Sequence, residues 1–214
     1  MAIAENGPLG VHRGKIENTV YYILNGQQIA RKIGRTTKPP TSGKLQHWAK
    51  VKLVNTFLST IKDFLRTGFG PESLGTTKNA FNMAVKMNFR SLVKGTYPGL
   101  EIDYPQLIVS KGKLKPAQNP LVAVEDAGLR FSWDTDPRMS FAEANEQAML
   151  LAYFPEHGKS VSKPFGAARQ SGTDLLALPE ALCTAYMEVY ISFIAADRTQ
   201  VSDSLYLGSL NQNG

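Results

Sequence analysis

The sequence predicts a β-rich α+β protein: an N-terminal β-hairpin plus two helices, followed by an immunoglobulin-like antiparallel β-sandwich. Three observations lead to this fold class. An Asn-Gly dipeptide separates two strand-like runs near the N-terminus. Apolar residues then recur at steps of three and four, and from about residue 101 the apolar period changes to two. The sign of the charge changes at the same place. We therefore expect a module over residues 1–98 and a sandwich over residues 101–210.

The N-terminal segment is expected to form an arm and a hairpin. Residues 1–14 contain three glycines and a proline and give little reason for a helix, so we predict an extended arm. A β-branched and aromatic run then leads to Asn25-Gly26, which suits a type I′ turn, and a return strand ends at Ile33. The pairs that a two-residue loop predicts are Leu24 with Gln27, Tyr22 with Ile29, and Val20 with Arg31.

Two amphipathic helices are predicted to follow the hairpin. The first begins near Thr41 or Ser42, either of which can cap it, and ends at Gly68. The second runs from about Thr77 to Val93. The apolar stripe of the first helix comprises Leu45, Trp48, Val51, Val54, Leu58, Ile61 and Leu65.

The second half of the chain contains short candidate strands separated by turn residues. Strands at this spacing are typical of a β-sandwich. The last two strands have the pattern that ends fibronectin type III and immunoglobulin-like domains, and Tyr186 is a candidate for their corner tyrosine. The candidate strands are 102–110, 121–125, 128–134, 147–154, 159–164, 173–178, 186–195 and 203–210.

Charge is spread unevenly over the 214 residues. Residues 1–100 carry 15 Lys and Arg against 4 Asp and Glu, whereas residues 101–214 carry 9 against 14. The basic half needs an anionic partner, which is either nucleic acid or the acidic half of a neighbouring copy. A solvated helix face with core aromatics would explain the same residues. The candidate cations for a partner or for phosphates are Arg13, Lys15, Arg31, Lys32, Arg35, Lys38, Lys44, Lys50 and Lys52, and the candidate aromatic contacts are Tyr21, Tyr22 and Trp48.

No catalytic or metal-binding pattern is present in the sequence. His12, His47 and His157 lack partners at metal-ligand spacing, and a single cysteine excludes an internal disulfide. The nucleophile elbow, the P-loop and the dinucleotide fingerprint are absent. We therefore expect a protein that is not an enzyme and that has no cofactor or metal.

The N-terminus lacks the basic and apolar regions of a secretory signal, and no stretch approaches the length of a membrane span. We expect synthesis in the cytoplasm without a signal peptide, no integral membrane association, and later incorporation in a particle or release by lysis.

Several segments together resemble a family of uncharacterised proteins from Bacteroidota. The resemblance covers nearly the whole chain and implies a full-length unit of basic hairpin, two helices and sandwich. The family has no assigned activity, so the resemblance implies no catalytic residues. The segments are 14–22, 25–27, Arg31, 38–41, 57–58, 68–69, 95–104 and 201–208.

These observations favour a non-enzymatic structural or assembly subunit, virion-like or filament-like. The basic module of one copy would dock on the acidic sandwich of the next, which makes a head-to-tail oligomer. The first alternative is a nucleic-acid-binding protein that places the basic hairpin and first helix on phosphates of DNA or RNA. The second alternative is a carbohydrate- or peptide-binding sandwich with Trp133 or Tyr153 as a platform.

Overall fold

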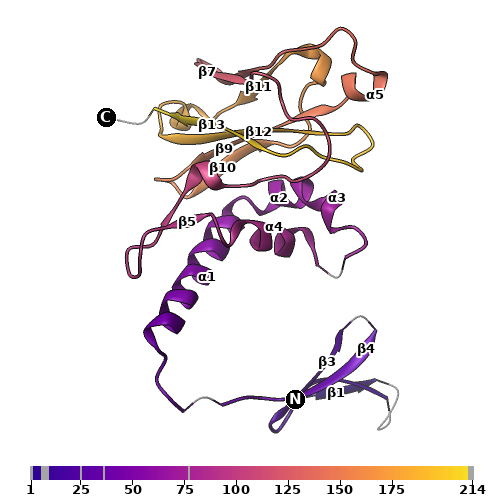
Figure 1. The fold of residues 1–214 in the computed structure, drawn as a ribbon, viewed down its shortest axis with the longest axis vertical. Helices are drawn as coiled ribbons and strands as arrows, with labels where there is room; N and C mark the ends of the chain where they lie inside the picture. Colours follow the sequence, from indigo (N-terminus) through magenta and orange to yellow (C-terminus); the bar gives the residue numbers. More distant parts are fainter. Residues whose placement is uncertain (1, 6–9, 25, 36, 77, 212–214) are drawn as a thin grey trace. The chain divides into compact units, whose positions relative to one another are not determined.

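The computed structural model describes residues 2–5, 10–24, 26–35, 37–76 and 78–211, with side chains from residue 10 onward. Contacts divide the chain into a first unit, Met1–Lys44, and a second unit, Leu45–Gly214 (Figure 1). The sequence analysis places its boundary later, near residue 100. The contacts group the helices with the β-rich half because helices and strands share one hydrophobic core.

The first unit is a four-stranded antiparallel sheet in the order β1-β2-β3-β4. The register of β3 and β4 confirms all three predicted pairs of the hairpin. Gly26 has a φ of +79°, as the predicted turn requires, and Asn25 lies outside the described residues. The strands are β1 (Ala2–Glu5), β2 (Val11–Ile16), β3 (Thr19–Leu24) and β4 (Gln27–Lys32).

The expectation of an extended arm over residues 1–14 is wrong wherever that segment is described. Residues 2–5 pair with residues 11–14, and β2 continues into the pairing with β3. Gly14 lies opposite both Ala2 and Tyr21 at a φ of +112°, a conformation that glycine adopts without strain. Gly14, which gave little reason for a helix, is therefore part of a strand that pairs on both sides.

The predicted first helix is divided in two. The helix breaks at Ile61, whose N–H contacts the carbonyl of Leu58 at 3.3 Å. Gly68 ends α2 as predicted, and a Cβ at that position would lie 2.2 Å from the carbonyl oxygen of Val109. The second predicted helix is shorter than expected and begins after Asn79, whose side chain caps it. The helices are α1 (Ser42–Thr60), α2 (Lys62–Gly68), α3 (Gly70–Ser73) and α4 (Ala80–Asn88).

The β-rich part of the second unit has two larger antiparallel sheets, in the orders β10-β9-β12-β13 and β11-β8-β7. Seven of the eight predicted strands are present with bounds within two residues of those expected. These strands are β7 (Leu121–Glu125), β8 (Gly128–Ser132), β9 (Gln147–Phe154), β10 (Lys159–Lys163), β11 (Thr173–Ala177), β12 (Met187–Ile194) and β13 (Leu205–Leu210).

The predicted strand over residues 102–110 is wrong. Only its first residue belongs to a strand, in the small β5–β6 pair, and a 3-10 turn that contains Pro105 follows. Proline lacks the N–H that a strand ladder needs, so the chain leaves the sheet there. The remaining short elements are β5 (Val93–Lys94), β6 (Glu101–Ile102), α5 (Phe141–Ala144), η1 (Tyr104–Gln106), η2 (Arg169–Ser171) and η3 (Glu180–Leu182).

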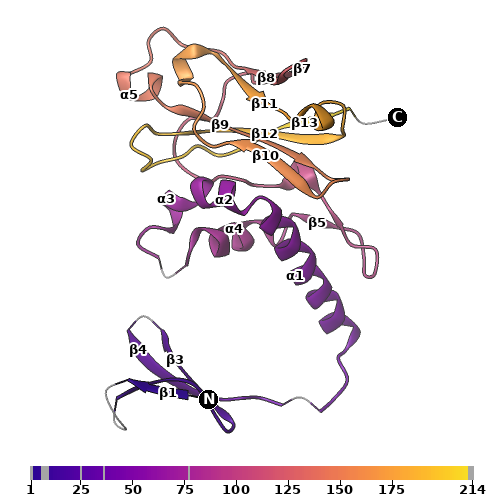
Figure 2. The same cartoon turned by 180° about the vertical axis from the view of Figure 1, so that it is seen from behind.

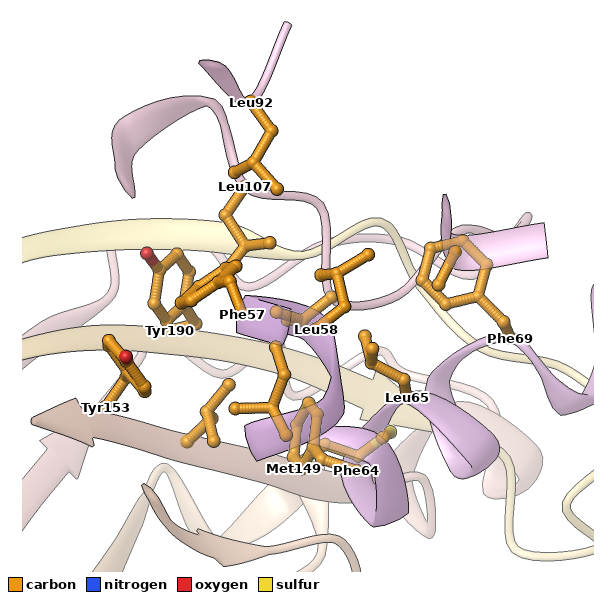
Figure 3. Packing of buried hydrophobic residues seen from close by; sticks show 14 of the residues in the cluster. Phe57, Leu58, Phe64, Leu65, Phe69, Leu92, Leu107, Met149, Tyr153 and Tyr190 are labelled. Atoms are coloured by element: carbon orange, nitrogen blue, oxygen red, sulfur yellow. The ribbon is translucent and has the colours of Figure 1, made fainter. Parts of the chain in front are cut away.

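Strands β9 and β12 are buried on both faces and organise two hydrophobic clusters. One face packs against the second sheet, where Phe193 contacts Trp133 at 5.3 Å between ring centroids. The other face is covered by helices α1, α2 and α4 (Figure 2). Figure 3 shows Phe57 and Leu58 of α1 against Tyr153 and Tyr190 of the sheet. Among the described helices, none is long and apolar enough to span a membrane.

Candidate functional site

The predicted cations of the first unit gather partly on one face of its sheet. The register aligns Lys15, Val20 and Arg31 across β2, β3 and β4. Side chains alternate between the two faces of a strand, so Arg13 and Tyr22 lie on the same face as this row. We call these five residues the basic face. It combines three of the predicted cations with one of the predicted aromatic residues.

The opposite face holds the other predicted residues of the sheet. Tyr21 stacks near His12, with ring centroids 5.8 Å apart, and Lys32 lies opposite Thr19 on the same side as Tyr21. Ile16 is also on this side and is 45% exposed. Tyr21 and Lys32 therefore cannot act together with Tyr22 and Arg31 on one flat partner.

Six further predicted contact residues follow β4 or lie on α1. Lys50 is engaged within the second unit, because its Nζ contacts the carbonyl of Arg90 at 3.4 Å and lies 5.2 Å from the ring centroid of Phe89. Trp48 is 49% exposed, so the first half of the apolar stripe of α1 is not buried. The six are Arg35, Lys38, Lys44, Trp48, Lys50 and Lys52.

The first unit has no core of its own. Over residues 10–24, 26–35 and 37–44, every side chain is exposed or half-buried on both faces of the sheet. Apolar residues share this exposure, and Leu24 is 52% exposed. A small sheet is stable in water when an apolar face is covered. Within the first unit, the sheet therefore has no face whose described side chains are buried.

Strand β7 forms a sheet edge of the second unit with exposed apolar side chains. Strand β7 ends its sheet and pairs with β8 alone among the described strands. Leu121 is 70% exposed and Val124 is 45% exposed, with the acidic pair Glu125-Asp126 directly after them. Exposed apolar edge strands are sites where another chain can add a strand. The sequence analysis predicted this strand but did not identify the exposure of its apolar side chains.

A buried carboxylate with two tyrosines occupies the floor of a depression of about 550 Å³ in the second unit. Glu188 is 2% exposed and accepts hydrogen bonds from Tyr186 and, at 2.6 Å, from Tyr206. Burial and these bonds raise the pKa of both tyrosines, so the hydroxyls stay protonated at neutral pH and cannot act as bases. The tyrosine-corner assignment of Tyr186 is wrong, since its hydroxyl donates to a side chain.

Other chemistry considered from the sequence finds no support in the described residues. Trp133 and Tyr153 are 5% and 6% exposed and belong to the two cores, so neither is a platform for a sugar or a peptide. Nowhere in the described part of the chain do three potential metal-ligating side chains gather.

Comparison with known proteins agrees with the extent of the resemblance seen in the sequence. The family of unknown function DUF6266 matches residues 11–208, which include most of the first unit's sheet and nearly all of the second unit. No curated protein and no solved structure matches the chain. The chain therefore belongs to the DUF6266 family, whose function is unknown.

Proposed function

We propose that this protein is a non-enzymatic assembly subunit, in which the N-terminal sheet of one copy docks on the β-rich half of the next. One observation carries the proposal: the first unit forms four paired strands, yet no side chain described in residues 10–44 is buried. Ordering a chain costs roughly 1–2 kcal/mol per residue, which burial must offset. A partner that covers one face of the sheet supplies that burial.

Charge favours another copy of the chain as the partner. Residues 1–44 carry 7 Lys and Arg against 2 Asp and Glu, whereas residues 101–214 carry 9 against 14. Stacking two N-terminal sheets would bring like charges together, whereas docking on the acidic half brings opposite charges together. Such a contact joins two different surfaces and repeats from copy to copy, which produces a filament or a ring.

The edge strand β7 is the acceptor that we favour. It joins exposed apolar side chains, Leu121 and Val124, to a turn that carries Asp126 and Glu125, of which Glu125 already pairs with Arg130 at 2.9 Å. Strand β4 is an edge of the first unit's sheet, and adding it to β7 would form main-chain hydrogen bonds and bring Arg31 toward the acidic turn.

We also propose that the two larger sheets form an immunoglobulin-like sandwich with the strand order of fibronectin type III domains. Of the seven strands, β7, β8 and β11 share one sheet. Strands β9, β12 and β13 share the other sheet, and β10 lies at its edge. This grouping corresponds to the A, B, E and C, F, G strands of immunoglobulin domains. An experimental structure in which β11 pairs with β9 would contradict it.

The test of self-assembly compares two double charge reversals by light scattering at low salt and micromolar concentration. The wild-type chain should form particles larger than a monomer. Lys15→Glu with Arg31→Glu alters the basic face and should return the scattering mass toward that of one chain. Lys86→Glu with Arg90→Glu changes the same charge at exposed positions near α4 and should leave assembly intact. Equal assembly of both variants, or a wild-type chain that stays monomeric, would count against the proposal.

Nucleic-acid binding is the second candidate function, and one observation favours it. Tyr22 shares the basic face with three cations, which suits phosphates and an exposed base. A fluorescent single-stranded oligonucleotide would then bind the monomer, and its affinity would fall steeply as salt rises. If the oligonucleotide binds and the protein alone stays monomeric, nucleic acid replaces the second copy as the partner.

A further inference from the structure

One hollow of the second unit, about 650 Å³ in volume, is lined by cations and aromatic rings. Lys62 and Arg66 project into it from α2, where residues four apart share one face. Arg198 reaches it from the turn between β12 and β13, and Phe81 and Phe165 supply apolar walls. Among the described residues that line the hollow there is no aspartate or glutamate. Its volume is in the range of small-molecule sites in proteins.

None of the three cations forms an ion pair with a carboxylate in the described part of the chain. The neighbouring Asp197 is already engaged, because its Oδ1 accepts hydrogen bonds from the backbone N–H and the hydroxyl of Thr199 at 3.0 and 2.8 Å. Like charges that converge on a concave surface raise the local positive potential and attract anions.

Arg198 occupies a backbone position that arginine seldom adopts. Its φ is +61°, a left-handed conformation in which glycine or asparagine is relaxed. The turn holds it there, because its N–H donates to the carbonyl of Ala195 at 2.8 Å. Its guanidinium carbon lies 4.1 Å from the ring centroid of Phe165. The turn and this ring contact fix the position of the Arg198 side chain at the hollow.

We propose that this hollow binds a ring-bearing phosphate of about the size of a nucleotide. The phosphate would lie among Lys62, Arg66 and Arg198, where guanidinium groups match its oxygens in a forked geometry. The ring would lie against Phe81 and Phe165 on the apolar side of the hollow. The site uses no residue of the N-terminal sheet, so it goes beyond the proposed assembly function and does not depend on it.

The experiment titrates the full-length protein with AMP, adenosine and inorganic phosphate by calorimetry. We expect AMP to bind at least tenfold more tightly than adenosine or phosphate alone. Arg198→Gly should weaken AMP binding at least tenfold and at the same time raise the melting temperature, because glycine relieves the backbone strain. Arg66→Gln, which leaves the backbone unchanged, should weaken AMP binding as well.

The matched control is Arg138→Ala, which removes an arginine whose side chain is 90% exposed and lies outside the hollow. It should bind AMP like the wild type. The proposal would be overturned by the absence of saturable AMP binding up to millimolar concentration. Equal affinities of Arg198→Gly, Arg66→Gln and the wild type, or equal affinities for AMP and adenosine, would also overturn it.

Discussion

Replacing Arg169 by methionine tests the account of how the second unit holds its polar interior. The Nε of Arg169 donates to Glu146 at 2.8 Å, and its Nη2 also reaches the carbonyl of Lys115 at 2.6 Å. The guanidinium carbon lies 3.7 Å from the ring centroid of Phe193. The side chains of Arg169 and Glu146 are only 4% and 8% exposed. Methionine fills similar volume but leaves the carboxylate of Glu146 buried without a cation.

Breaking a buried ion pair by removing one partner costs about 3–5 kcal/mol, because an uncompensated charge stays in the interior. We expect the free energy of unfolding of Arg169→Met at pH 7 to fall by that amount in urea titrations followed by circular dichroism. The double variant Arg169→Met with Glu146→Leu should recover most of the loss, since it leaves no buried charge.

The loss of stability caused by Arg169→Met should depend on pH. Burial raises the pKa of Glu146 in the folded protein despite the neighbouring Arg169, and loss of the cation should raise it further. A raised carboxyl pKa means that the folded state binds the proton more tightly than the unfolded state. Stability is therefore retained below the unfolded pKa and lost as pH rises through the folded pKa. The difference in the free energy of unfolding between the wild type and Arg169→Met should become smaller as the pH falls from 7 toward 4.

This reasoning is tested by comparing the loss in unfolding free energy of Arg169→Met with that of Glu125→Gln. The Glu125→Gln change breaks the Arg130 ion pair, whose side chains are both 41% exposed, and exposed pairs contribute little because water screens them. If Arg169→Met destabilised the protein no more than Glu125→Gln, the buried pair would not hold the interior as described.

Two further changes test the packing of the second unit. Gly68→Ala would place a Cβ 2.2 Å from the carbonyl oxygen of Val109, so the unfolding free energy should fall by about 1–3 kcal/mol; Gly70→Ala, with nothing within 4 Å, is the control in the same urea titration. Glu188→Leu removes the acceptor of two tyrosine hydroxyls and should cost about 1–3 kcal/mol by the same assay. If the free energy of unfolding of Glu188→Leu equalled that of the wild type, water would replace the carboxylate at no cost in stability.

Local sequence patterns predicted the hairpin register and seven of the eight strands. The register followed from Asn25-Gly26, because a two-residue turn aligns its flanking strands. The strands followed from the period of two. The same patterns grouped Tyr21 and Tyr22 as candidate contacts, but the strand register places their side chains on opposite faces of the sheet.

Tertiary structure alone decided the features that join distant segments. The pairing of β8 with β11 and of β9 with β12, the helix break at Ile61 and the Arg169–Glu146 pair leave no local signal. The hollow that brings Lys62, Arg66 and Arg198 together also has no local signal in the sequence. In each case the physical reason is that packing and burial act between residues far apart in the chain, whereas periodicity and turn chemistry act between neighbours. The sequence by itself determined where strands and most turns lie, and only the folded chain decided which surfaces they make together.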